Sequence, residues 1–446
     1  MALFGTSGIR GIYGKDVNDG LASKITYIFA GTCKQEKIVV GRDTRESGER
    51  LFEAIASTGM GIIDLGVVPT PTLALATMKH KCPGIMITAS HNPPEYNGLK
   101  LLLDGAEIPR EMEKKIEKEY FETITSVERK APHVTKDHGA IKEHMEAIKK
   151  AVDSEGIKSK KFKVIIDCNG AGSVLTPYLL QELGCNVLSI NAETSGFNRA
   201  SEPNEKNLQH LIGIMKAVGA DVGFAHDGDA DRVIVIDENG EILPLDVQLA
   251  IMIEHELDNA KTNNKTEIRK IISTVEASLL IRETIEKNKG TPIITRVSSV
   301  EISELMKKEN AVFGGEPCGE YVFSGPTRAP DGPLAVAKFL EIITQKGKFN
   351  GLKRKYVQYP ILRDKFKCER KYEAVAKIIE QVKQMEINGK ITTIDGLRVD
   401  EKDGWFLIRT SGTEPIIRLT AEYRGIQALD RRVKEISQVI KSVVSI

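Results

Sequence analysis

A serine and a histidine stand side by side where an apolar run ends. Gly84 to Ile87 reads as a buried strand, and Asn92-Pro93-Pro94 forces a turn after it. Ser90 and His91 therefore lie at a strand end, where the sites of α/β folds collect. An isolated pair of this kind is usually a turn-capping serine with a histidine packed on it. Three further loops decide between that reading and a serine nucleophile.

Two basic residues are expected near this serine. Asn97-Gly98 lies between apolar runs, which is a strong hairpin signal and brings Lys100 back toward Ser90. Lys100 is there either a site group or an edge lysine whose amine extends to solvent. Near the start of the chain, the glycines of residues 4–11 allow close approach of a ligand, and Arg10 can clamp a phosphate. A glycine-rich turn without function explains that stretch equally well.

Three aspartates alternate along a short loop between two apolar stretches. Asp227, Asp229 and Asp231 would repel one another in a partly buried loop, and a hard divalent cation such as Mg²⁺ relieves that repulsion. An EF-hand is the rival reading, because Glu238 falls at its last ligand position. Arg232, however, stands where that loop needs glycine, and strands flank the loop in place of helices. A solvated acidic turn is the remaining alternative.

Two later loops suit a phosphorylated sugar. Residues 314–320 form a glycine-rich turn whose carboxylates can accept hydrogen bonds from sugar hydroxyls. Residues 409–415 combine a guanidinium, hydroxyls and a glycine, a composition that matches a phosphate. A plain turn and a polar hairpin are the alternatives. Mg²⁺ beside a serine suggests phosphoryl transfer, and a separate phosphate site implies a substrate that already carries a phosphate.

The elements that position these loops repeat along the chain. The order strand, small-residue loop, helix, strand begins near residues 37, 162 and 270. This rhythm predicts three related α/β domains, followed by a smaller C-terminal α+β domain. The expected domains are residues 1–153, 154–252, 253–364 and 365–446.

The bulk composition describes a soluble globular protein. The 446 residues are 41% hydrophobic and 28% charged, and the net charge of +1 provides no general field for nucleic acid or membranes. The six cysteines are scattered without a CxxC pair, so neither a disulfide framework nor a zinc knuckle is expected. Residues 1–10 lack the apolar core of a signal peptide. A cytoplasmic protein without nucleic-acid or membrane partners is expected.

Together the four loops resemble, in order and over nearly the whole chain, the signature loops of the α-D-phosphohexomutase family. The resemblance implies four domains around a central cleft, each contributing one loop. It also implies an isomerase that interconverts hexose 6-phosphate and 1-phosphate. The matching stretches are Thr88-Ala89-Ser90-His91-Asn92-Pro93, Asp227-Gly228-Asp229-Ala230-Asp231-Arg232, Gly315-Glu316-Pro317-Cys318-Gly319 and Arg409-Thr410-Ser411-Gly412-Thr413-Glu414-Pro415.

The same resemblance implies the role of each site residue. Ser90 is expected to be a phosphoserine that donates and later recovers a phosphate, and one Mg²⁺ is expected on the aspartates and the phosphorylated serine. A sugar 1,6-bisphosphate would be the intermediate and the activator, in a monomer or homodimer. The expected catalytic residues are Ser90, His91, Arg10, Lys100 and Arg232, the metal ligands Ser90, Asp227, Asp229 and Asp231, and the substrate-binding residues Glu316, Cys318, Glu320, Arg409, Ser411, Gly412 and Thr413.

The chain departs from the family pattern in the stretches expected to recognise the sugar. Cys318 and Glu320 replace a serine and a histidine, and Val297-Ser298-Ser299 replaces Val-Gly-Asp. The extra carboxylate of Glu320 favours a positively charged amino sugar, so glucosamine phosphate is the expected substrate. Glucose or mannose phosphate is the alternative. An aspartate-nucleophile phosphatase and a non-catalytic phosphosugar-binding protein are further alternatives, against which Ser90 and the three aspartates argue.

Overall fold

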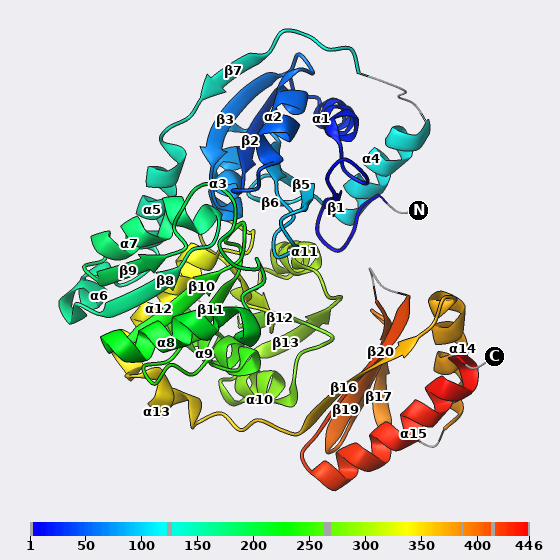
Figure 1. Cartoon of the computed structure of the whole chain (residues 1–446). Helices are drawn as coiled ribbons and strands as arrows, with labels where there is room; N and C mark the ends of the chain where they lie inside the picture. The colour runs from blue at the N-terminus through cyan, green and yellow to red at the C-terminus, as the bar shows by residue number, and fades with distance from the viewer. Residues whose placement is uncertain (1–2, 123–126, 263–268, 386, 412–414, 445–446) are drawn as a thin grey trace.

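The computed structural model describes residues 3–122, 127–262, 269–385, 387–411 and 415–444. The described chain forms four sheets, one after another along the sequence (Figure 1). Among the described helices, none has both the length and the apolarity that a membrane span requires.

The first sheet carries the Ser90 loop. Its strands run in the order β1-β5-β4-β2-β3-β7, with β6 paired to β5. The neighbours β4 and β5 are antiparallel, whereas β2 is parallel to both β3 and β4. The strands are β1 (Ile9–Ile12), β2 (Lys37–Arg42), β3 (Gly61–Val67), β4 (Gly84–Ile87), β5 (Tyr96–Leu103), β6 (Ala106–Glu107) and β7 (His133–Lys136), and the helices are α1 (Asp19–Cys33), α2 (Gly48–Ala56), α3 (Thr70–His80), α4 (Arg110–Glu122) and α5 (Ala140–Lys150).

The second sheet carries the aspartate loop. Its order is β11-β10-β8-β9, and β10 is antiparallel to β11 but parallel to β8. Its elements are α6 (Ser154–Lys160), β8 (Lys163–Asp167), the 3₁₀ helix η1 (Ala171–Val174), α7 (Thr176–Glu182), β9 (Asn186–Ile190), the 3₁₀ helix η2 (Glu205–Leu208), α8 (Gln209–Val218), β10 (Val222–His226) and β11 (Val233–Ile236).

The third sheet repeats this pattern around the sugar loop. Its order is β13-β12-β14-β15, with β14 antiparallel to β15. A single hydrophobic core, from Met145 to Leu352, packs beneath the second and third sheets together. The elements are α9 (Leu245–Thr262), β12 (Lys270–Thr274), α10 (Leu279–Lys287), β13 (Thr291–Thr295), α11 (Ser299–Glu309), β14 (Phe313–Glu316), β15 (Glu320–Phe323), α12 (Gly332–Lys346) and α13 (Phe349–Lys353).

The fourth sheet is antiparallel throughout and has a core of its own. Its order is β16-β20-β19-β18-β17. Residues 354–360 lead to it from α13, and it lies to one side of the other three sheets (Figure 1). The elements are β16 (Ile361–Lys367), α14 (Lys371–Gln384), β17 (Gly389–Thr392), β18 (Leu397–Glu401), β19 (Gly404–Thr410), β20 (Ile416–Tyr423) and α15 (Ile426–Val444).

Each candidate loop joins two antiparallel neighbours, β4 to β5, β10 to β11, β14 to β15 and β19 to β20. One local prediction was wrong, because Asn97-Gly98 is no hairpin turn but lies inside β5. The expected boundaries 252/253 and 364/365 fall inside α9 and β16. We therefore propose boundaries just before these two elements, together with the expected boundary at 153/154.

Candidate active site

Ser90 lies on the loop that leaves β4, with its hydroxyl directed at the aspartate loop. Its Oγ donates a hydrogen bond of 2.7 Å to Oδ2 of Asp227, and Nδ1 of His91 lies 3.4 Å from the same Oγ. Ser90 is 1% exposed and has a φ of 51°, the left-handed region that residues other than glycine rarely adopt. The structure thus brings together the predicted nucleophile and the predicted metal loop.

The three aspartates are buried and close together. One carboxylate oxygen of each lies within 4.8 Å of the other two. Lys100 reaches them from β5, and its Nζ lies 2.7 Å from Oδ2 of Asp229 and 2.5 Å from Oδ2 of Asp231. The prediction that Lys100 approaches the Ser90 region is therefore correct, although the Asn97-Gly98 turn invoked for it does not exist.

The donor set fits a divalent cation. Oδ1 of Asp229 and Oδ1 of Asp231 are buried, and neither has a hydrogen-bond partner among the described residues. Buried carboxylate oxygens without partners are costly, and oxygen ligands of this kind are what Mg²⁺ prefers. The hydroxyl of Thr70 adds a hydrogen bond of 2.5 Å to Oδ2 of Asp229, so the start of α3 orients this carboxylate. The sequence carried no local signal for that threonine.

The charges of the aspartate cluster favour binding of an additional cation. Burial and the neighbouring Asp229 raise the pKa of Asp227 to about 6. Burial alone would lower the pKa of Lys100, but Asp229 and Asp231 raise it, so the amine is charged. Three carboxylates held by one ammonium group are under-compensated, and an added cation would relieve the remaining repulsion.

The basic residues predicted around Ser90 are present as a group. The guanidinium of Arg232, burial and the charge of Arg10 lower the pKa of His91 to about 2, so its imidazole is neutral. Arg10 lies on β1, where its Nε donates to the carbonyl oxygen of Ser7 at 3.0 Å and its Nη1 to Oδ1 of Asn92 at 3.4 Å. These guanidinium groups suit a phosphoryl group on Ser90.

The sugar loop touches the aspartate loop directly. Arg232 donates from Nε to Oε1 of Glu320 at 2.8 Å, and its Nη2 lies 2.6 Å from the same oxygen. Glu316, Cys318 and Glu320 place their ligand atoms within 4.8 Å of one another. Burial and the charge of Glu320 raise the pKa of Glu316 well above its usual range. Oε1 of Glu316 has no hydrogen-bond partner among the described residues.

The expected phosphate nest belongs to the fourth domain and is only partly described. Arg409 forms an ion pair with Glu276 of the third domain, with Nη2 and Nε lying 2.6 and 2.8 Å from Oε1. Ser411 is buried, and its carbonyl oxygen accepts a hydrogen bond from Nζ of Lys371 at 2.6 Å. Arg418 approaches Oγ of Ser411 at 3.5 Å. Gly412 and Thr413 lie outside the described residues.

Ser298 and Ser299, which stand where the family pattern has Gly and Asp, contact the first domain from the third. Oγ of Ser298 donates to the carbonyl oxygen of Thr6 at 2.9 Å, and Oγ of Ser299 donates to Oε1 of Glu107 at the same distance. The other oxygen of Glu107 accepts from Oγ of Ser7 at 2.8 Å. These serines therefore support the loop that precedes β1 and Arg10, a role that the sequence did not reveal.

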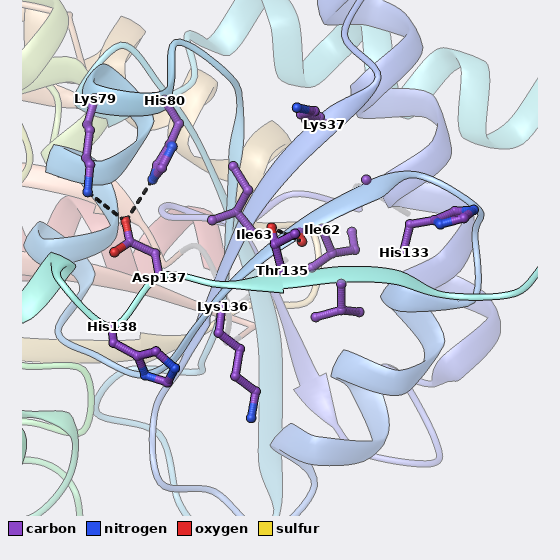
Figure 2. Close-up of a pocket in the computed structure, with 12 residues that line it drawn as sticks. Lys37, Ile62, Ile63, Lys79, His80, His133, Thr135, Lys136, Asp137 and His138 are labelled. Carbon is purple, nitrogen blue, oxygen red and sulfur yellow. Dashed lines mark hydrogen bonds and ion pairs between the residues drawn. The ribbon is translucent and has the colours of Figure 1, made fainter.

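A surface cavity of about 630 Å³ lies away from these loops, between β3, β7 and α3 (Figure 2). Lys79 and His80 both contact Asp137 there, at 2.9 and 2.8 Å (Figure 2). None of the predicted site residues lines it. The candidate active site is therefore the junction of the Ser90, aspartate and sugar loops, not this cavity.

Comparisons with known proteins identify the family of this chain. The profiles of the four phosphoglucomutase/phosphomannomutase domains match in order, the first three described as alpha/beta/alpha domains I, II and III and the last as the C-terminal domain. They match residues 1–126, 142–240, 245–357 and 364–439.

Curated relatives match along the entire chain. A probable phosphoglucosamine mutase of Methanococcoides burtonii is 40% identical, with 100% of each chain covered. One of Pyrococcus horikoshii is 38% identical, with 99% of this chain and 98% of the relative covered. A phosphoglucomutase/phosphomannomutase of Thermococcus kodakarensis is also 38% identical, with 95% of each covered.

Solved structures share the fold. A phosphoglucomutase/phosphomannomutase family protein of Burkholderia thailandensis has a TM-score of 0.85 at 25% identity, with 99% of this chain and 97% of that chain covered. An Aspergillus fumigatus N-acetylphosphoglucosamine mutase in complex with GlcNAc-6P and magnesium has a TM-score of 0.64 at 15% identity, with 99% and 96% covered. The chain therefore belongs to the phosphoglucomutase/phosphomannomutase (α-D-phosphohexomutase) family and is a mutase.

Proposed function

We propose that this mutase interconverts the 6-phosphate and 1-phosphate of glucosamine through a phosphoserine at Ser90. The observation that carries the proposal is the hydrogen bond of 2.7 Å from Oγ of Ser90 to Asp227, within a buried cluster of three aspartates. Because the hydroxyl proton is directed at Asp227, the lone pairs of Oγ remain available to a phosphoryl group. A serine held in this way is suited to accept and return a phosphate.

The proposed reaction conserves the phosphoryl group. Phosphorylated Ser90 gives its phosphoryl group to a free sugar hydroxyl, which loses a proton, and the sugar becomes a 1,6-bisphosphate. The bisphosphate turns over, and its other phosphate returns to Oγ of Ser90 as the P–O bond to the sugar breaks and the sugar oxygen regains a proton. Arg10, Arg232 and Lys100 supply fixed positive charge where the phosphoryl group is transferred.

A bound Mg²⁺, held by Asp227, Asp229, Asp231 and the phosphorylated Ser90, would neutralise charge on the transferring group. The unpartnered oxygens of Asp229 and Asp231 support this ligand set. A phosphate on Ser90 would also counter the positive charges that hold His91 neutral. A sugar 1,6-bisphosphate is the proposed activator, because it can phosphorylate Ser90 in the resting enzyme.

The sugar loop supports an amino sugar. Glu316 and Glu320 lie close together, and within the described part of the chain only Glu320 is ion-paired with a cation, Arg232. A substrate ammonium group would compensate the second carboxylate and supply its unpartnered oxygen with a donor. The relatives named as probable phosphoglucosamine mutases support the same choice. Glu316, Cys318 and Glu320 are thus the proposed sugar-binding residues, and Arg409, Ser411, Gly412 and Thr413 the proposed binding residues for the other phosphate.

The alternative within the family is a phosphoglucomutase or phosphomannomutase, which the relative of Thermococcus kodakarensis represents. The test compares kcat/KM for glucosamine, glucose and mannose phosphates, in the wild type and in Glu316→Gln. We expect glucosamine phosphate to be preferred and Glu316→Gln, which removes the carboxylate proposed to meet the ammonium group, to reduce that preference about tenfold, or about 1.4 kcal/mol. Glu286→Gln, a change at an exposed third-domain residue that pairs with Arg282, is the matched control. An amino sugar that is the poorest substrate refutes the assignment.

The phosphoserine is tested by mass spectrometry of the Ser90 peptide after incubation with a hexose 1,6-bisphosphate. A mass increase of one phosphate on that peptide, absent in Ser90→Ala, is the expected result. An enzyme that isomerises its substrate without phosphate on Ser90 would contradict the mechanism.

Light scattering would determine whether the enzyme is a monomer or a homodimer. All six cysteines are unpaired, which supports the proposal of a cytoplasmic enzyme acting on phosphosugars.

A further inference from the structure

The loop of Ser90 is held in place by an arginine that the proposed reaction does not use. Arg45, three residues after β2, is 4% exposed. Its Nη2 donates to the carbonyl oxygens of Ser90 and Asn92 at 2.7 and 2.9 Å. Its Nη1 donates to those of Pro93 and Tyr96 at 2.5 and 2.8 Å. One planar guanidinium thus binds four carbonyl groups between residues 90 and 96, a geometry that lysine cannot reproduce.

The guanidinium is itself oriented by a buried carboxylate. Nε of Arg45 donates to Oδ2 of Asp43 at 3.0 Å. The same oxygen accepts a hydrogen bond of 2.6 Å from Oγ1 of Thr88, and that hydroxyl accepts one of 2.8 Å from the backbone N–H of Ser90. The N–H and the carbonyl of Ser90 are therefore both fixed by one connected set of side chains.

The second domain closes this set from the opposite side. Oγ of Ser201 donates to the carbonyl oxygen of Ser90 at 2.7 Å and is buried. The ring of Phe197 lies over the guanidinium of Arg45, with 4.9 Å from its centroid to Cζ. Arg199, between these two residues, anchors their loop through a hydrogen bond of 2.9 Å from Nε to Asp167.

These contacts explain how Ser90 keeps a strained backbone. Its φ of 51° is rare for a residue with a Cβ, and such conformations persist where the surroundings determine them. Rotation to an ordinary φ would turn Oγ away from Asp227. We propose that Arg45, Asp43 and Ser201 form a clamp that positions Ser90 for phosphoryl transfer, with Arg45 as its central residue. This inference rests on the proposed function of Ser90.

The matched pair for the test is Arg45→Lys and Arg42→Lys. Arg42 belongs to the same stretch, but it pairs with Asp64 and Glu49, at 3.0 and 2.8 Å, and does not bind the Ser90 loop. For each variant and for Ser201→Ala, kcat, KM, phosphate uptake by Ser90 and hydrogen exchange of residues 88–96 are measured.

The clamp predicts that Arg45→Lys lowers kcat about 100-fold, because a displacement of about 1 Å at a reacting group costs that much. KM should change less than about threefold, since the sugar and phosphate loops are untouched. Exchange in residues 88–96 should accelerate in Arg45→Lys but not in Arg42→Lys. Ser201→Ala, which removes a single donor, should lower kcat about tenfold.

Wild-type kcat in Arg45→Lys, or a loss of kcat with unchanged exchange in residues 88–96, overturns the clamp. If Arg45→Lys does not fold, Ser201→Ala decides alone, and unchanged kcat and exchange in that variant overturn the proposal. A wild-type enzyme that takes no phosphate on Ser90 instead refutes the proposed function. In that case the difference in exchange between Arg45→Lys and Arg42→Lys still tests whether the clamp holds the loop.

Discussion

Replacing Lys100 with methionine should destabilise the Mg²⁺-free enzyme. The side chain is 1% exposed, and its ammonium group contacts Asp229 and Asp231 at 2.7 and 2.5 Å. Breaking a buried ion pair by removing one partner costs about 3–5 kcal/mol, and here the nearby Asp227 adds repulsion. For a folding unit of roughly 150–250 residues, a loss of about 4 kcal/mol corresponds to a fall in Tm of roughly 10 °C.

Mg²⁺ should restore much of the stability that the variant loses, because it supplies positive charge to the same carboxylates. A ligand at 100 times its Kd stabilises the folded state by about 2.7 kcal/mol. The variant lacks the competing ammonium group, so it should bind Mg²⁺ more tightly and gain more stability than the wild type. Calorimetric scans in EDTA and in excess Mg²⁺, on wild type and variant, measure both effects.

Lys338→Met is the matched control. Lys338 is also buried, with Nζ 3.3 Å from both Glu256 and Glu341, in a network without a proposed metal site. Its replacement should lower Tm by an amount that Mg²⁺ does not alter. The reasoning is refuted if Lys100→Met melts with the wild type in EDTA, or if Mg²⁺ raises the Tm of all three proteins equally.

Two further predictions concern the stability of the fold. A Cβ on Gly98 would lie 2.1 Å from the carbonyl oxygen of Ile9 and 2.8 Å from that of Thr88, so Gly98→Ala should lower the free energy of unfolding by about 3 kcal/mol in urea denaturation. Gly31→Ala, in α1 with open space around it, should raise it by about 1 kcal/mol, and a loss of equal size in both variants would refute the steric argument. Burial raises the pKa of Glu341, but the hydrogen bond from His255 and the charge of Lys338 hold it at about 2, below its ordinary 4.5. Its ionised form therefore adds about 3 kcal/mol above pH 4.5, a contribution that is lost as the pH falls toward 2. The urea midpoints of the wild type and Glu341→Gln should differ at pH 7 and converge on acidification, and a constant difference would contradict this.

The four loops were recognisable because each follows an apolar strand that stops abruptly at small and polar residues. This local signal also gave the order of the α/β domains. The Asn97-Gly98 prediction was wrong for a physical reason. Gly98 is required by the close approach of β1 and of residue 88, and no turn is involved. Asn97 is occupied by a hydrogen bond of 2.8 Å to Ser47.

The supporting residues gave no comparable signal, because their contacts join distant parts of the chain. Ser201 reaches the carbonyl of Ser90 across 111 positions, and Thr70 reaches Asp229 across 159. Helix α5 is rich in charged residues, yet its His144 is fully buried between Thr72 and Asp331, at 2.8 and 2.9 Å. Periodicity predicts an element, but only the packing of several domains determines which polar residues become interior.

The ion pair between Arg409 and Glu276 has a consequence for selectivity. The guanidinium proposed to bind the distal phosphate already has a carboxylate partner in the third domain. An incoming ligand must therefore outcompete Glu276 for this arginine. A phosphate dianion, with its higher charge and three terminal oxygens, can do so, whereas a sugar hydroxyl cannot. Unphosphorylated sugars would leave the two domains joined by this pair and be discriminated against before any chemistry begins.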